Sequence, residues 1–112
     1  YKGEAKYLEE GSFVAWLAQE GEDIIGTSGI CFYSVPPTFG NPSGDVAYIM
    51  NMWTRLDWRR QGIGQSLLDK LLEEASRRGI RKVLLDTTDI GRSLYAKNGF
   101  VAIDNEMMRM LD

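Results

Sequence analysis

The strongest constraint on the fold is a change in the spacing of apolar residues at Gly62. After this glycine the apolar residues recur at helical spacing, at Ile63, Leu67, Leu68, Leu71, Leu72 and Ala75. This spacing predicts an amphipathic helix, which Gly79 would end. The apolar runs 45–54 and 82–86 on either side lack helical spacing and predict buried strands. A strand, a helix and a strand in this order form a crossover, which requires parallel pairing in the sheet.

Segments earlier in the chain are typical of antiparallel strands. Residues 12–18 and 23–33 are rich in β-branched and aromatic residues, and the polar stretch 19–22 separates them. This pattern predicts a hairpin. The stretch 35–44, which contains prolines and glycines, predicts a loop before the central strand at 45–54.

The C-terminal part completes the expected fold. A short helix is expected at 90–98, ended by Gly99, with closing strands at 100–103 and 107–111. Together these elements predict an α+β fold with a mixed sheet. The chain has 112 residues, so we expect one domain, 1–112, because too few residues remain to build a second core.

The composition is that of a soluble globular protein, with 44% hydrophobic and 26% charged residues. Cys31 is the single cysteine, so no internal disulfide can form, and a reducing cytoplasm is the expected location. No apolar run reaches the roughly 20 residues needed to cross a bilayer. We therefore expect no contact with a membrane and no signal peptide.

Charge is distributed unevenly along the chain. The net charge of −3 argues against binding to nucleic acid. Residues 55–82 nevertheless carry eight basic and four acidic side chains. This basic block fits either a localised anionic ligand or a solvated helix face.

The segment 54–66 leads from the end of a strand directly into the start of a helix. Gly62 and Gly64 allow a tight turn, and the first N–H groups of a helix have no partner inside it. With Arg59 and Arg60 beside them, these amides are suited to a pyrophosphate. The alternative is a glycine turn that only joins two elements. Neither a Walker A motif nor a dinucleotide fingerprint fits, because the lysine of the first and the third glycine of the second are absent.

Two motifs in this order resemble the GNAT acetyltransferases. The first is Arg59-Arg60-Gln61-Gly62-Ile63-Gly64, preceded by Leu56-Asp57-Trp58, and the second is Leu94-Tyr95-Ala96-Lys97-Asn98-Gly99-Phe100. The resemblance covers roughly residues 12–111 and includes 86–92, which looks like a bacterial branch of the family. It implies a GNAT-like, mostly antiparallel mixed sheet with helices packed on it. It also implies acetyl-CoA as co-substrate, an amine of a small molecule or peptide as acceptor, and no metal.

The resemblance also assigns roles to individual residues. The backbone amides from Arg60 to Ser66 would hold the pyrophosphate of acetyl-CoA, beside the Arg59 side chain. The backbones of Met52, Trp53 and Thr54 would pair with the pantetheine arm. The residues implied to bind acetyl-CoA are therefore Met52, Trp53, Thr54, Arg59, Arg60, Gln61, Gly62, Ile63, Gly64, Gln65 and Ser66. Tyr95 would be the general acid that protonates the departing thiolate, although a tyrosine here could also serve only to pack the short helix onto the sheet.

The sequence departs from the family pattern in places. Leu56 stands where proline is usual and Arg60 where glycine is usual, but neither change removes a backbone donor. Family members begin with a strand and one or two helices, and only residues 1–11 precede the first expected strand here, so we expect an N-terminally truncated member. No histidine is present to act as a general base. Four carboxylates are candidates by their strand-end or loop positions, and none is singled out: Asp45, Asp86, Asp89 and Glu106.

Other functions remain open. The chain could be a non-catalytic module that binds acyl-CoA and in which Tyr95 only packs, or a plain α/β protein whose glycine turn binds nothing. Cys31 lies in no motif that would mark it as a nucleophile, which favours direct attack in a ternary complex over a covalent enzyme intermediate. The methionines at 107–110 suggest a flexible edge or the surface of a homodimer.

Overall fold

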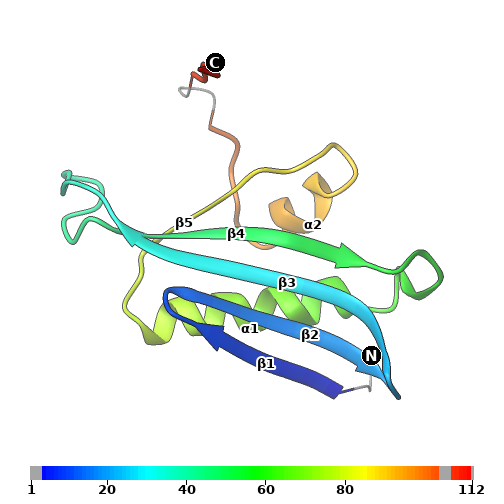
Figure 1. The fold of residues 1–112 in the computed structure, drawn as a ribbon. Helices are drawn as coiled ribbons and strands as arrows, with labels where there is room; N and C mark the ends of the chain where they lie inside the picture. The colour runs from blue at the N-terminus through cyan, green and yellow to red at the C-terminus, as the bar shows by residue number, and fades with distance from the viewer. Residues whose placement is uncertain (1–3, 104–106, 112) are drawn as a thin grey trace.

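The protein forms a five-stranded mixed sheet in the order β1-β2-β3-β4-β5 (Figure 1). The computed structural model describes residues 4–103 and 107–111. The elements are β1 (Glu4–Glu10), β2 (Phe13–Glu20), β3 (Asp23–Ser34), β4 (Asp45–Thr54), the 3-10 helix η1 (Leu56–Trp58), α1 (Ile63–Arg77), β5 (Lys82–Leu85) and α2 (Arg92–Lys97). The first four strands pair antiparallel and β5 pairs parallel to β4. The predicted α+β class is therefore confirmed.

The elements on which the site depends follow their predicted positions closely. β2 and β3 form the predicted antiparallel hairpin, and the loop 35–44 connects β3 to β4. β4, α1 and β5 form the predicted crossover, and its two strands pair in parallel over Val46–Ile49 and Lys82–Leu85. α2 is shorter at both ends than the predicted helix at 90–98.

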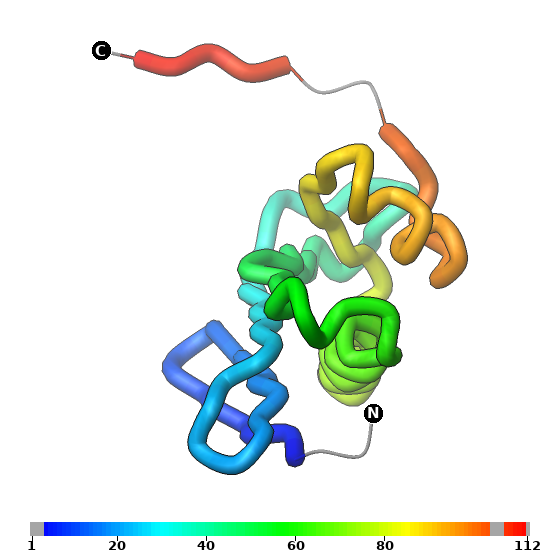
Figure 2. The backbone as a smooth tube through the Cα atoms, turned by 90° about the vertical axis from the view of Figure 1, so that its right-hand side faces the viewer, coloured from blue at the N-terminus to red at the C-terminus, as the bar shows by residue number. Residues whose placement is uncertain are grey.

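The core lies between the sheet and α1. In Figure 2 α1 is seen end-on, on one side of the sheet, and α2 lies on the same side. The buried core cluster combines residues of three strands and both helices: Val14, Ile30, Ala47, Ile49, Leu68, Leu71, Ala75 and Tyr95. The apolar stripe predicted for α1 is the part that packs here, since Leu68 and Leu71 are fully buried. Among the described residues, no helix is both long and apolar enough to cross a membrane.

β1 is a strand that the sequence pattern did not predict. Its residues are mostly charged and exposed, with little of the alternation that marks a half-buried strand. It pairs with β2 from Glu4 opposite Gln19 to Glu10 opposite Phe13, across a two-residue turn. Tyr7 attaches it to the core through an edge-to-face contact with Trp16, with ring centroids 5.0 Å apart.

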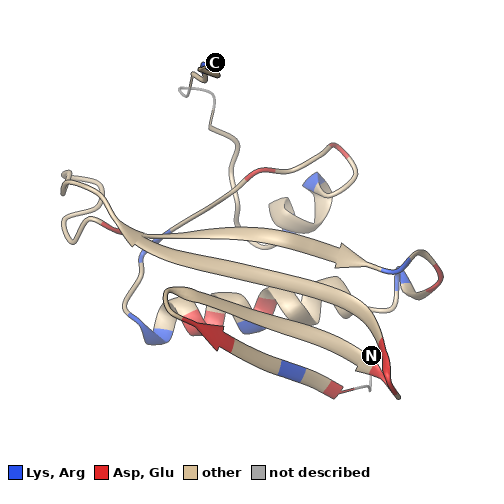
Figure 3. Ribbon diagram, in the orientation of Figure 1, with Lys and Arg blue, Asp and Glu red and all other residues tan. Residues whose placement is uncertain are grey.

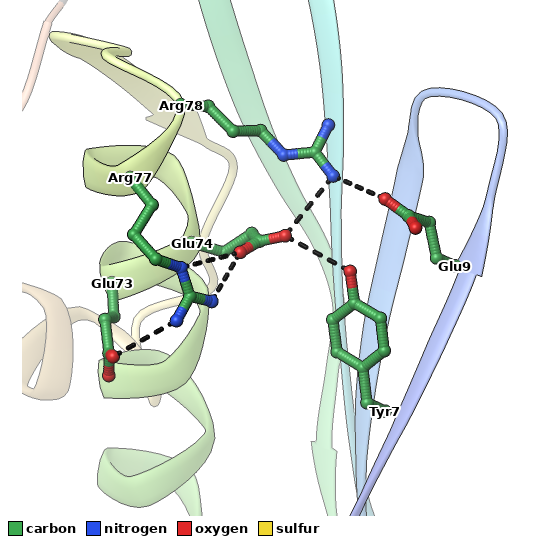
Figure 4. A network of polar contacts seen from close by, with 6 residues as sticks. All are labelled: Tyr7, Glu9, Glu73, Glu74, Arg77 and Arg78. Carbon is green, nitrogen blue, oxygen red and sulfur yellow. Dashed lines mark hydrogen bonds and ion pairs between the residues drawn. The ribbon is translucent and has the colours of Figure 1, made fainter.

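A network of polar contacts joins β1 to the end of α1 (Figure 4). The Tyr7 hydroxyl donates to Glu74 Oε1 at 3.2 Å, and Arg78 Nη2 donates to both Glu74 Oε1 at 3.3 Å and Glu9 Oε1 at 2.7 Å. Arg77 donates to Glu74 Oε2 from Nε at 3.2 Å and also from Nη2. The Glu74 side chain is only 10% exposed, so these donors replace the water that burial removes.

Replacing Glu74 with glutamine should lower the free energy of unfolding by about 2 kcal/mol, because charge-assisted hydrogen bonds at a buried carboxylate are replaced by weaker ones. The neighbouring Glu73 is the matched control. Its side chain is 69% exposed and accepts one contact from Arg77 at 3.3 Å, so Glu73→Gln should change stability by less than about 0.5 kcal/mol. Urea unfolding of both variants measures the difference, and equal effects would contradict the network's role.

The loss of stability in Glu74→Gln should also depend on pH. Hydrogen bonds from Arg77, and then from Arg78 and Tyr7, lower the pKa of Glu74 against the opposing effect of burial. A carboxyl group with a lowered native pKa stabilises the fold above its unfolded pKa of about 4.3, and this contribution is lost as the pH falls through the native pKa. The wild-type protein and Glu74→Gln should therefore converge in stability in acid.

The prediction of closing strands at 100–103 and 107–111 is wrong. Neither segment is a strand in the structure, and the residues between them, 104–106, lie outside the described residues. In Figures 1 and 2 residues 107–111 lie apart from the sheet. Val101 is 82% exposed and Met107 is 101% exposed, so their apolar character, which suggested strands, is not used in burial here.

Candidate functional site

β4 carries an irregularity at the end where it approaches α1. Thr27 and Gly29 of β3 pair with Trp53 and Met50 of β4, so β4 contains one extra residue, which is a β-bulge. Asn51 lies in this bulge with a φ of 57°, and the Thr27 hydroxyl donates to its carbonyl at 2.6 Å. The bulge therefore has a fixed conformation held from the neighbouring strand.

The two parallel strands separate just before this bulge. Pairing between β4 and β5 ends at Ile49 opposite Leu85, while β4 continues to Thr54 beside β3 alone. In Figure 1 the chain after β5 leaves β4 and leads to α2. The edge of β4 over residues 50–54 thus faces a gap in the sheet that begins at the carboxyl end of β5, which is where open α/β sheets place ligands.

The backbone of Thr54 is directed toward this gap. The Arg55 N–H donates to the Ile25 carbonyl at 2.8 Å, and N–H groups alternate between the two edges of a strand. The N–H of Thr54 therefore faces away from β3. Its carbonyl accepts a hydrogen bond from Arg59 Nε at 3.1 Å, which holds the Arg59 side chain back against the strand end.

The turn at Gly62 lies eight residues after Thr54. Gly62 has a φ of 84°, a left-handed conformation that suits glycine, and it is the N-cap of α1. The first helical hydrogen bond runs from the Ser66 N–H to the Gly62 carbonyl at 3.0 Å. The N–H groups of Ile63, Gly64 and Gln65 thus precede any acceptor within the helix, whereas the Ser66 N–H is already used.

The start of α1 is positioned by a close approach to the sheet. Gly26 of β3 has no side chain, and a Cβ there would lie 2.9 Å from Ile63 Cγ2 and 3.3 Å from Leu67 Cδ1. Ile63 is 1% exposed and packs in a second cluster with Ala18 and Ile25. The side chain of Ile63 anchors the turn, so a role for this residue in binding is restricted to its backbone.

The basic block predicted from the sequence is divided in space. Figure 3 shows basic residues near the turn before α1 and others at the far end of this helix. The 15 residues of α1 separate the two groups by about 22 Å. Arg77 and Arg78 at the far end pair with acidic side chains, as does Arg55 with Asp57 at 2.7 Å. Among the described residues neither Arg59 nor Arg60 forms an ion pair, so the cations available at the turn are these two.

Arg60 has a backbone conformation that is unusual for a residue with a side chain. Its φ is 64°, in the left-handed region where an ordinary residue costs about 1–2 kcal/mol. A glycine at this position would meet no such cost. A cation is thus held next to the turn at the expense of local strain.

Tyr95 lies on α2, which packs against the first turn of α1. The side chains of Gln65 and Asn98 exchange two hydrogen bonds of 2.8 and 2.9 Å, and Leu94 approaches Gly64. Tyr95 is 8% exposed and contacts Phe100 edge-to-face at 5.8 Å. Burial raises the pKa of its hydroxyl, so the proton stays on at neutral pH.

A pocket of about 700 Å³ lies between β5, α2 and residues 100–103. It is lined by Tyr95 and also by Tyr48, Asp86 and Arg92. The Tyr48 hydroxyl donates to the Asp86 carboxylate, a contact between β4 and the residue after β5 that the sequence did not indicate. The structure therefore brings residues 52–54 and 59–66 to one end of the β4–α1 unit, with Tyr95 on the adjoining helix.

The four candidate bases occupy very different places. Asp45 starts β4 at the opposite end from the turn and accepts a hydrogen bond from Ser34 at 2.9 Å. The Asp89 side chain is fully exposed and lies 3.6 Å from Arg92. Glu106 lies outside the described residues. Asp86 is the one that lines the same pocket as Tyr95.

Two similar solved structures are described as acetyltransferases. A predicted acetyltransferase from Clostridium acetobutylicum, solved with acetyl-CoA, is 38% identical with a TM-score of 0.84, and the match covers 88% of this chain and 64% of that one. A GCN5-related N-acetyltransferase from Ralstonia eutropha JMP134 is 30% identical with a TM-score of 0.82, covering 89% and 65%. The chain thus spans slightly less than two thirds of the length of these two proteins.

The sequence comparisons agree with the fold. A comparison with curated proteins gave no match. The model of the Acetyltransferase (GNAT) family matches residues 2–100, which include both motifs and every element of the sheet and helices described above. The chain belongs to the Acetyltransferase (GNAT) family.

Proposed function

We propose that this chain forms one N-acetyltransferase domain, which transfers the acetyl group of acetyl-CoA to a primary amine of a small molecule or peptide. The observation that carries this proposal is the turn at Gly62 with its open amides, which lies eight residues after Thr54, at the end of the β4 edge that β5 leaves unpaired. The Clostridium acetobutylicum relative was solved with acetyl-CoA. The pyrophosphate would bind the amides of Ile63 to Gln65, with Arg59 and Arg60 beside it.

The rest of acetyl-CoA would follow the gap between β4 and β5. The pantetheine arm carries amides, which would pair with the backbone edge of Met52, Trp53 and Thr54 as an added strand does. A backbone N–H at the bulge could then polarise the thioester carbonyl, which is worth about 3 kcal/mol in the transition state. The arm would bring the thioester to the pocket that Tyr95 lines.

The reaction would proceed by direct attack in a ternary complex. The amine nitrogen adds to the acetyl carbon, the C–S bond then breaks, and the amine loses a proton to solvent or to a nearby carboxylate. Tyr95 would give its proton to the departing thiolate and recover one from solvent. A phenol with a raised pKa suits this role because it is fully protonated at neutral pH.

Two measurements test the proposal. Calorimetry should detect saturable binding of acetyl-CoA, and a panel of amines should release CoA in a thiol assay. Binding without release from any amine would favour the second candidate, an acyl-CoA-binding module in which Tyr95 only packs. This candidate is kept because Tyr95 belongs to the core cluster. An absence of acetyl-CoA binding would end both candidates.

Replacing Arg60 with glycine should weaken acetyl-CoA binding about fivefold, because a cation next to the phosphates is lost while the backbone conformation is retained. The variant should be no less stable than the wild-type protein, since glycine fits a φ of 64° without strain. Its affinity should also depend less on salt than that of the wild type. Calorimetry at two salt concentrations measures both effects, and unchanged affinity would remove Arg60 from the site.

A further inference from the structure

We propose that Asp86, held by Tyr48, is the docking group for a positively charged acceptor amine. This inference rests on the proposed function and specifies its second substrate as an ammonium-bearing molecule. The site is the Asp86 carboxylate with the Tyr48 hydroxyl bound to it, at the point where β4 and β5 separate.

The position of the pair follows from the register of the two strands. Tyr48 pairs with Leu84, while their neighbours Ile49 and Leu85 pack in the core beneath α1. Side chains alternate between the faces of a sheet, so Tyr48, Leu84 and Asp86 point to the face opposite α1. Tyr95 belongs to the core cluster on the α1 side and lines the same pocket as Tyr48 and Asp86. A thioester that reaches this pocket would thus have Tyr95 on one side and the carboxylate on the other.

The hydrogen bond prepares the carboxylate for a ligand. A carboxylate has about four acceptor positions, and the Tyr48 hydroxyl occupies one of them. The bond restricts the rotation of the Asp86 side chain and leaves the remaining positions open. Asp86 is exposed, and in the part of the chain that the structure describes no lysine or arginine forms an ion pair with it. A carboxylate that is oriented, accessible and unpaired is suited to an ammonium group.

The basic side chains that line the pocket form no ion pair with the Asp86 carboxylate in the described part of the chain. Arg81 and Arg92 also line the pocket, and Arg92 lies 3.6 Å from Asp89. Apolar residues of β5, α2 and 100–103 form the rest of the lining, among them Leu72, Val83, Leu85 and Phe100. Among the described residues that line this pocket, Asp86 is the one carboxylate, and it lies in the same lining as the cations Arg81 and Arg92.

Binding can be measured separately from turnover. The probes are putrescine, lysine amide and kanamycin, and 1,4-butanediol is the uncharged counterpart of putrescine. With the protein saturated with CoA, at least one amine should shift the ring signals of Tyr48 in an NMR titration, and butanediol should not. Asp86→Asn should weaken the binding of that amine at least tenfold, Tyr48→Phe should weaken it less, and Asp86→Glu should restore part of the affinity.

Asp89→Asn is the matched control, because it removes a neighbouring carboxylate that is fully exposed and whose 3.6 Å contact with the exposed Arg92 is weak. This variant should bind the amine within twofold of the wild type. With an amine that is turned over, Asp86→Asn should raise KM at least tenfold with a smaller change in kcat, and acetyl-CoA affinity should stay the same. Melting temperatures of all variants confirm that they are folded.

The outcomes separate this inference from the proposed function. If no amine binds near Tyr48, or if Asp86→Asn and Asp89→Asn behave alike, the docking role is wrong, while acetyl-CoA binding and CoA release would still support acetyl transfer. If acetyl-CoA does not bind, the proposed function fails, while an Asp86-dependent amine signal would still support the docking site.

Discussion

Replacing Tyr95 with phenylalanine should slow CoA release about 10²-fold under the proposed function, with little change in acetyl-CoA affinity. General acid catalysis typically contributes 10²- to 10⁴-fold, and a thiolate is a good leaving group, which places the loss at the lower end. The fold should tolerate the change. Within residues 4–103 and 107–111 the Tyr95 hydroxyl has no hydrogen-bond partner, while the ring packs in the core cluster. Steady-state kinetics with the best amine measure the effect.

The pH dependence gives a second check on Tyr95. Burial raises its pKa above the usual value of about 10, so the phenol should stay protonated, and active as an acid, from pH 7 to pH 9. Wild-type kcat should therefore show no fall in this range from loss of this proton. Equal rates for the wild type and Tyr95→Phe would assign the ring to packing alone and favour the binding module.

Replacing Gly62 with alanine should weaken acetyl-CoA binding at least tenfold. Alanine at a φ of 84° costs about 1–2 kcal/mol, and relief of this strain would turn the N–H groups of Ile63 and Gly64 away from their present directions. The space around Gly62 is open, so the effect is one of backbone conformation and not of a steric clash.

Gly64→Ala is the matched control in the same turn. Gly64 is already helical, and a Cβ there would meet Leu94 Cδ2 at 3.5 Å, an ordinary contact distance. Its acetyl-CoA affinity should remain within threefold of the wild type. Calorimetry measures the acetyl-CoA affinity of both variants. An equal loss of affinity in Gly62→Ala and Gly64→Ala would mean that the left-handed turn does not set the binding geometry.

Much of the fold could be predicted because local spacing and burial agree. The stripe of α1 and the apolar run of β4 are both used in the core, so their patterns report their structure directly. β1 was missed because its charged residues show little pattern, although Glu10-Gly11-Ser12 resembles the Glu20-Gly21-Glu22 turn that did predict a hairpin. The reverse error occurred at 107–111, where apolar residues predicted a strand and the described structure has none.

Some features of the candidate site could likewise be predicted from the sequence, and others could not. The turn at Gly62 is local in sequence, so its geometry followed from the residues themselves. The bulge at Asn51 depends on pairing with β3, and the contact between Tyr48 and Asp86 joins residues 38 positions apart. Such features depend on strand register, which a single sequence does not reveal. Asp86 could therefore be named only as one of four carboxylates until the structure placed it.

Because Gly26 has no side chain, a substitution there would affect the acetyl-CoA site indirectly. A methyl group there, on the sheet beneath Ile63, would push outward the end of the helix that carries the open amides. Loss of cofactor affinity could then originate in a residue that never meets the cofactor. Sequence changes at this glycine belong with those of the turn itself when variants are ranked by their effect on activity.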